Sequence, residues 1–214
     1  MRVFKKFAVA TVGLVLGMAA ASPAQAAILS ASEGGKIIDA PDSTAVNAEV
    51  SDLMQGFDEK QNVLLKKDLK VDFGEIIEAG TEVNSHMIFL DSPGSSDVTQ
   101  IVEWLFDGEI LGIMSDPAGN LEAASNSILG AEDTQYGSFG ARGLEAGKER
   151  NGYVKDGNKL NLKMRVTSPG DWIRVVTKAN PTQSVPEPAS ILGLLGVGAF
   201  GATSTLKRKK KQKE

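Results

Sequence analysis

His86 is the only histidine in the sequence, and the sequence has no cysteine. Cysteine thiolate catalysis, zinc–thiolate sites, iron–sulfur clusters and disulfides are therefore excluded. One imidazole also cannot complete a metal centre that needs two or three histidines. No Gly-x-Ser-x-Gly motif marks a serine that could form a hydrolytic triad with His86. We interpret His86 as a histidine packed within a strand rather than as a catalytic base, and we predict no catalytic residue.

Carboxylates are the other groups in this sequence that could do chemistry. Pairs that are close in sequence include Glu75 with Glu78 and Asp107 with Glu109. Two carboxylates can serve as the acid and base of a glycosidase, so an enzyme of this type stays open. No pair is distinguished from the others, however, and an acidic solvated surface accounts for all of them.

Metal and sugar sites give weaker signals. Three oxygen-rich turns could offer calcium ligands: Asp91–Asp97, Asp116–Asn120 and Asp156–Asn158. None has the spacing of an EF-hand loop with its closing glutamate, and Asp and Asn also occur in turns for backbone reasons. We predict no cofactor and leave calcium as the one open case. Trp104, Trp172 and Tyr153 could form a sugar-binding platform, but their alternating neighbours favour a core position.

The charge of the chain is unevenly distributed. Residues 27–185 carry 14 Lys and Arg against 25 Asp and Glu, a net charge of −11, whereas the whole chain has −4. Such an acidic domain repels phosphate backbones, so we exclude nucleic acid as a partner. The basic residues that offset this charge concentrate at the two ends of the chain.

The pattern between the ends predicts strands joined by glycine and proline turns. We expect strands at 36–40, 69–73, 81–90 and 172–177, a short helical turn at Leu121–Asn126 and a long glycine-rich loop at 127–151. No helix longer than two turns is expected. Many short strands predict an all-β fold, an antiparallel β-sandwich of the jelly-roll kind. The predicted core residues are Leu69, Val71, Phe73, Phe89, Val102, Trp104, Phe106, Leu160, Leu162 and Val175.

Two hairpins are predicted from turn residues between apolar runs. Asp107-Gly108 separates Val102–Phe106 from Ile110–Ile113, and Asp-Gly favours a type I′ turn because both of its central residues need positive φ. The second turn is Asp156-Gly157-Asn158, which precedes the clearest alternation of apolar and polar residues, at 160–166.

The first 26 residues have the three parts of a secretory signal peptide. A positive start is followed by an apolar run at 7–21, and Ala24 and Ala26 provide the small residues that signal peptidase needs. We predict cleavage before Ala27; an uncleaved N-terminal anchor is the alternative.

The C-terminal residues combine three ordered features. Pro186-Glu187-Pro188 is followed by an uncharged run at 189–206 and by six basic residues, Lys207, Arg208, Lys209, Lys210, Lys211 and Lys213. The run would span about 27 Å as a helix, just short of the ~30 Å hydrocarbon core, so it is a marginal membrane span. The basic cluster should stop translocation and stay in the cytoplasm. A permanent anchor that is never processed is the alternative to a removable one.

These three features resemble a PEP-CTERM sorting signal. The resemblance implies export in a bacterium with an outer membrane, processing by the membrane enzyme exosortase, and an association with extracellular polysaccharide. Parts of the middle segment, such as 168–175, also resemble uncharacterised exported proteins with this tail. This second resemblance gives no information about an activity.

We therefore predict a signal peptide (1–26), a β-sandwich ectodomain (27–177), a linker (178–185) and a sorting tail (186–214) with a transmembrane helix at 189–206. The precursor is expected in the inner membrane with its C-terminus in the cytoplasm, and the mature protein at the cell surface or outside the cell. The expected partners are signal peptidase, an exosortase-like enzyme, the membrane before processing, and extracellular polysaccharide. The predicted function is a non-catalytic surface or matrix protein; the alternative is a carbohydrate-active hydrolase or lyase that uses acidic residues of the ectodomain.

Overall fold

The computed structural model describes residues 27–92, 97–144, 152–167 and 169–180. The predicted signal peptide (1–26) and sorting tail (186–214), with its helix at 189–206, lie outside these residues. Within the described ranges, no helix has the length and apolar character needed to cross a membrane.

The smaller of two sheets has four antiparallel strands in the order β1-β7-β10-β9. They are β1 (Ile28–Ala31), β7 (Val98–Phe106), β10 (Lys159–Val166) and β9 (Gly152–Asp156). In β10, Leu160, Leu162, Met164 and Val166 are buried, and the residues between them are not. This period of two places one apolar face of the small sheet against the rest of the protein.

The larger sheet has seven strands, six of them in the order β2-β3-β6-β11-β8-β5, with β4 added to β6. They are β2 (Gly35–Ile37), β3 (Met54–Asp58), β4 (Val63–Leu64), β5 (Phe73–Gly74), β6 (Glu82–Leu90), β8 (Ile110–Met114) and β11 (Asp171–Lys178). Among the described strand pairs only β2 and β3 are parallel.

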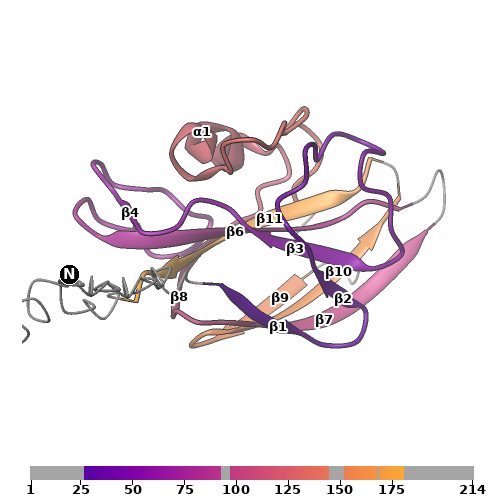
Figure 1. Cartoon of the computed structure of the whole chain (residues 1–214), viewed down its shortest axis with the longest axis horizontal. Coiled ribbons are helices and arrows are strands. Elements are labelled where there is room, and N and C mark those ends of the chain that lie inside the picture. The colour runs from indigo at the N-terminus through magenta and orange to yellow at the C-terminus, as the bar shows by residue number, and fades with distance from the viewer. Residues whose placement is uncertain (1–26, 93–96, 145–151, 168, 181–214) are drawn as a thin grey trace, which may run out of the picture.

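The two sheets and one helix form three layers (Figure 1). The main core lies between the sheets and includes Trp104, Leu162 and Val175, all fully buried. Helix α1 (Asn120–Leu129) covers the outer face of the large sheet. The residues of the main core come from both sheets, so residues 27–180 contain a complete two-layer core. The predicted all-β sandwich is thus confirmed at the level of two packed sheets.

The outer face of the large sheet carries its own apolar clusters. Leu129 of α1 packs with Met114 and Val176, and Phe89 and Trp172 pack beneath the loop that follows the helix. Strands β6 and β11 are therefore covered on both faces. That explains why burial is continuous along them, at 83–90 in β6 and at 172–177 in β11, and does not alternate.

The hairpin predicted at Asp107-Gly108 is wrong, because β7 and β8 belong to different sheets. Neither Asp107 nor Gly108 has the positive φ that a type I′ turn requires. Glycine is needed at 108 for another reason: a Cβ there would lie 2.1 Å from the carbonyl oxygen of Lys178. The connection passes from one sheet to the other and packs against the end of β11.

The hairpin predicted at Asp156-Gly157-Asn158 is confirmed. Asp156 of β9 faces Lys159 of β10, which leaves Gly157 and Asn158 as the connection. Gly157 has φ 59°, the left-handed conformation that glycine adopts without strain.

Two further predictions need correction. The helical turn expected at Leu121–Asn126 is a ten-residue helix, so the expectation of no helix beyond two turns is wrong. The strand expected at 69–73 is mostly irregular: Leu69 forms an isolated bridge with Ile77, and β5 begins only at Phe73. Of the predicted core residues there, Leu69 is buried and Val71 half-buried, but Phe73 is 38% exposed because it lies on the edge of the sheet.

Candidate functional site

His86 lies between two polar side chains, those of Asp58, which is partly exposed, and Thr177, which is buried. Its Nδ1 is 2.7 Å from Asp58 Oδ1, and its Nε2 is 3.0 Å from Thr177 Oγ1. An acid, a histidine and a hydroxyl in this order have the connectivity of a hydrolytic triad. His86 and Thr177 are fully buried, however, and the His86 ring lies 4.9 Å from that of Phe106. No substrate can reach the hydroxyl in this arrangement, so the chain of side chains supports the fold.

A second polar network joins the large sheet to α1. Arg174 of β11 makes two hydrogen bonds to the Glu59 carboxylate, each 2.7 Å long, and both side chains are fully buried. Arg174 also donates to the carbonyl of Glu122 and to Ser125 Oγ, both in α1. Burial alone would lower the pKa of Arg174, but the Glu59 carboxylate raises it, so the ion pair persists.

The start of helix α1 lies beside three carboxyl groups, those of Asp72, Asp116 and Glu122, which no sequence motif places together. The carboxylate of Asp116 accepts hydrogen bonds from the backbone N–H of Asn120 and of Leu121, each 3.0 Å long. Burial raises the pKa of Glu122 to about 8, and the nearby charges of Asp116 and Asp72 add to this shift. For Asp116, burial would raise the pKa, but the two backbone N–H donors lower it below its ordinary value. At neutral pH these opposite shifts favour a protonated Glu122 beside an ionised Asp116, the combination that an acid–base couple uses.

Access to Glu122 argues against such a role. Its side chain has no solvent exposure, and neither of its oxygens has a hydrogen-bond partner among the described residues. Asp72 accepts hydrogen bonds from Ser115, whose hydroxyl is 3.0 Å from that of Tyr153. A catalytic acid needs contact with its substrate, so this cluster would have to open before it could act.

Three of the four carboxylates named as pairs from the sequence line a shallow polar hollow of about 480 Å³. Glu75 and Glu78 line it together with Glu109, so one pair and half of the other come together there. Asp107 does not line it. Across the described ranges, no group of three or more acidic, histidine or cysteine side chains is arranged to hold a metal ion.

The remaining candidate residues have structural positions. Trp104 and Trp172 are fully buried, as predicted, and only Tyr153 is half-buried, so a sugar platform of all three is not formed. Of the three oxygen-rich turns, Asp116–Asn120 caps α1 and Asp156–Asn158 closes a hairpin. Residues 93–96 of the third turn lie outside the described residues.

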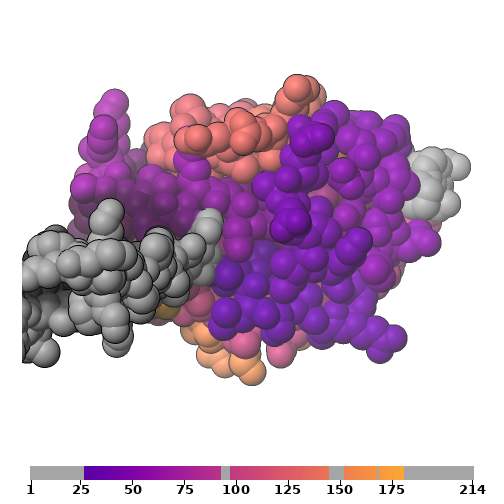
Figure 2. Space-filling view, in the orientation of Figure 1, coloured from indigo at the N-terminus to yellow at the C-terminus, as the bar shows by residue number. Residues whose placement is uncertain are grey.

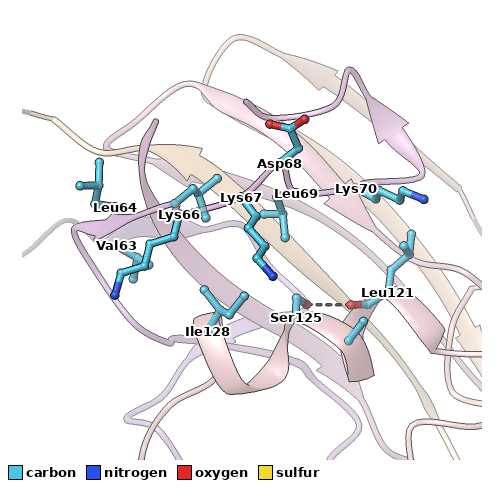
Figure 3. Close-up of a pocket in the computed structure, with 12 residues that line it drawn as sticks. Val63, Leu64, Lys66, Lys67, Asp68, Leu69, Lys70, Leu121, Ser125 and Ile128 are labelled. Atoms are coloured by element: carbon cyan, nitrogen blue, oxygen red, sulfur yellow. Dashed lines mark hydrogen bonds between the residues drawn. The ribbon is translucent and has the colours of Figure 1, made fainter. Parts of the chain in front are cut away.

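A groove of about 590 Å³ lies between α1 and the segment at 63–70 (Figure 3). Hereafter this is called the α1 groove. Its apolar residues are Val63, Leu64, Leu65, Leu69, Leu121, Ala124 and Ile128. Leu64 is 60% exposed and Ile128 45% exposed, whereas Leu65 and Leu69 are buried.

Residues 63–70 form the wall of the α1 groove that faces the helix, and backbone hydrogen bonds hold this wall in place. Leu65 donates its N–H to Thr81 and accepts that of Gly80, while Leu69 exchanges two hydrogen bonds with Ile77. The Asp68 carboxylate accepts the N–H of Ala79 at 2.9 Å and points away from the groove. Val63 and Leu64 also pair with β6, so these residues are attached to the large sheet independently of α1.

The rim of the α1 groove is cationic. Lys66, Lys67 and Lys70 line it and are exposed. Figure 3 shows Lys66 and Lys67 extending from the wall toward α1. None of the three forms an ion pair with a described residue. No sequence motif predicted this rim. Three lysines among five consecutive residues of an otherwise acidic domain are the signal that could have indicated it.

A comparison with family models identifies a motif at the C-terminus. Residues 184–209 match the model of the PEP-CTERM protein-sorting motif. The chain carries a PEP-CTERM sorting motif. No curated protein and no solved structure matches the chain.

The match confirms the resemblance stated from Pro186, Glu187 and Pro188 and from the basic cluster. The PEP-CTERM motif marks an exported protein that is processed by exosortase at the membrane. The motif residues and the basic cluster, like Ala24 and Ala26 of the signal peptide, lie outside the described residues, so their roles stay predictions.

Proposed function

We propose that this chain is a non-catalytic protein of the cell surface or extracellular matrix, delivered there through its PEP-CTERM motif. The match of residues 184–209 carries the proposal. It is supported by the ectodomain, in which His86, Glu59 and Glu122 are buried. The side chains of His86 and Glu59 are engaged in hydrogen bonds that hold the strands together.

The proposed route begins with signal peptidase, which cuts after Ala26. The ectodomain then crosses the inner membrane, residues 189–206 span it, and Lys207–Lys213 stay in the cytoplasm. A central Lys or Arg costs about 2.5–3.5 kcal/mol to insert, so six in one cluster cannot follow the ectodomain across. Four glycines in the apolar run, at 193, 196, 198 and 201, make it a weak anchor that suits temporary use.

Processing near Pro186-Glu187-Pro188 then separates the ectodomain from the helix. Proline lacks an N–H and keeps its predecessor out of the helical conformation, so the motif presents an extended segment to the enzyme. The proposed association with extracellular polysaccharide rests on the sorting motif, because the two tryptophans of the candidate sugar platform are buried.

The route is tested with Glu187→Ala in a host that contains exosortase. The variant should be exported but remain as full-length protein in the membrane fraction. Glu214→Ala makes the same substitution beyond the matched residues and should be processed like the unsubstituted chain. Equal release of both variants would refute the role of Glu187.

The alternative is a carbohydrate-active hydrolase or lyase that uses acidic residues of the ectodomain. Asp116 and Glu122, whose pKa values shift in opposite directions, are its candidate acid–base pair, and it requires that the buried Glu122 become accessible to a substrate. Screening the ectodomain against extracellular polysaccharides separates the two functions. Cleavage that is lost in Glu122→Gln would establish the enzyme and overturn the non-catalytic proposal. If no polysaccharide is cleaved, the result supports the non-catalytic proposal.

A further inference from the structure

The α1 groove combines an apolar interior with a cationic rim. Its volume of about 590 Å³ falls within the range of small-molecule sites, which are lined mostly by apolar side chains with a few polar groups at defined places. Ser125, the buried polar residue of the lining, donates its hydroxyl hydrogen bond to the Leu121 carbonyl at 2.8 Å (Figure 3). The interior therefore offers little for a polar ligand to bind.

The rim reverses the charge of the domain around it. Residues 27–185 have a net charge of −11, yet Lys66, Lys67 and Lys70 stand together at the groove. Asp68, the acidic residue among them, points away and is engaged by the N–H of Ala79. A ligand that fits this surface needs a hydrocarbon part for the interior and a negative group for the lysines.

From this complementarity we infer that the α1 groove binds a free single-chain anionic amphiphile of the fatty-acid type. The hydrocarbon chain lies between Leu65 and Leu69 of the wall and Ala124 and Ile128 of α1. The carboxylate lies beside Lys66 and Lys67, which extend toward the helix (Figure 3). This binding function goes beyond the proposed sorting route and does not depend on it.

The apolar ends of the chain itself fit this groove poorly. The run at 189–206 is followed by six basic residues, and the run at 7–21 is preceded by Arg2, Lys5 and Lys6. Either end would bring positive charge to a rim that is already cationic. A free amphiphile has no such charge, and Figure 2 shows that α1 and the loops beside it lie on the outside of the molecule, where a small ligand can approach.

Binding is measured by isothermal titration calorimetry on residues 27–185, which contain the complete two-layer core. Sodium dodecanoate below its micelle concentration is the probe, and dodecyltrimethylammonium supplies the same chain with the opposite charge. We expect one dodecanoate per chain and at least tenfold weaker binding of the cationic amphiphile. Equal binding of the two would overturn the role of the lysines, and no binding of dodecanoate would overturn the proposal.

Two pairs of variants locate the site. Ala124→Phe fills the groove and should abolish binding, whereas Ala123→Phe changes the exposed neighbour on the same helix, which does not line the groove. Lys66→Glu combined with Lys67→Glu should weaken binding about tenfold or more, the effect of losing one charge-assisted hydrogen bond, while Lys36→Glu on β2 should not. All of these positions are exposed, so the fold should tolerate the changes. Equal effects of a variant and its control would overturn the site.

The same binding experiments can reveal two other occupants of the α1 groove, a membrane surface and a second copy of the chain. Phosphatidylglycerol vesicles that bind the domain when dodecanoate does not would assign the groove to a membrane surface. Sedimentation of a dimer that Ala124→Phe disrupts, without dodecanoate binding, would assign it to a second copy. Either result contradicts the proposal, whatever the outcome of the Glu187→Ala experiment.

Discussion

Arg174 and Glu59, which are 115 residues apart in sequence, form a fully buried ion pair with two hydrogen bonds of 2.7 Å. Tyr136 and Ser85 each donate a further hydrogen bond of 2.6 Å to the same carboxylate. The pair joins β11, the end of β3, α1 and the loop after it. The packing of α1, and with it one wall of the α1 groove, depends on this network.

Removing one partner of this pair should destabilise the protein severely. We expect Arg174→Ala to lower the free energy of unfolding by about 3–5 kcal/mol, because Glu59 is left charged and buried. The pair Lys60–Glu132, at 3.6 Å, is the control because Lys60 is 31% and Glu132 80% exposed, and Lys60→Ala should cost less than ~1 kcal/mol. Urea unfolding measures both. Similar losses for the two variants would show that burial of the Arg174–Glu59 pair does not set its strength.

Glu122 should make the stability depend on pH between about 5 and 8. The folded pKa of about 8 lies above the ordinary value of 4.5, so the folded state holds a proton that the unfolded state releases. Its stabilising contribution is full below pH 4.5 and is lost as the pH rises to 8, by at most ~1.4 kcal/mol per pH unit.

The variant Glu122→Gln keeps the neutral form at every pH and should remove this decline. The exposed Glu75→Gln is the matched control and should retain it. Urea unfolding from pH 5 to 8 compares them. An unchanged pH dependence in Glu122→Gln would contradict the raised pKa.

Two phenylalanines that were both predicted in the core should differ in their contribution to stability. Phe89 is 1% exposed and packs edge-on to Phe57, with ring centroids 6.1 Å apart, so Phe89→Ala should cost about 3–5 kcal/mol. Phe73 is 38% exposed at the sheet edge, and Phe73→Ala should cost clearly less. Thermal unfolding measures both losses, and equal losses would contradict the exposed position of Phe73.

Local patterns predicted the elements whose environment is simple. β10 has one buried face, so its alternation was readable, and the turn at Gly157 needs a positive φ that glycine supplies. The pair Asp107-Gly108 gave a wrong hairpin prediction, because glycine is required at 108 by the nearby carbonyl oxygen of Lys178 and not by a type I′ turn. A local motif cannot distinguish these two reasons.

The candidate sites depend on contacts between distant segments, which no local pattern reports. Glu59 and Arg174 look like ordinary surface charges in the sequence. The α1 groove arises because residues 63–70 and α1, about fifty residues apart, join one apolar cluster with Met114 and Val176 of the large sheet. The PEP-CTERM motif was predicted correctly because its three features are contiguous and occur in a fixed order.

The most direct test of the sorting account is C-terminal mass spectrometry of the protein recovered outside the cell. We predict mature chains that begin at Ala27 and end near Pro186-Glu187-Pro188, without the apolar run at 189–206. Mature chains that still end at Glu214 would show a permanent anchor and contradict processing of the tail.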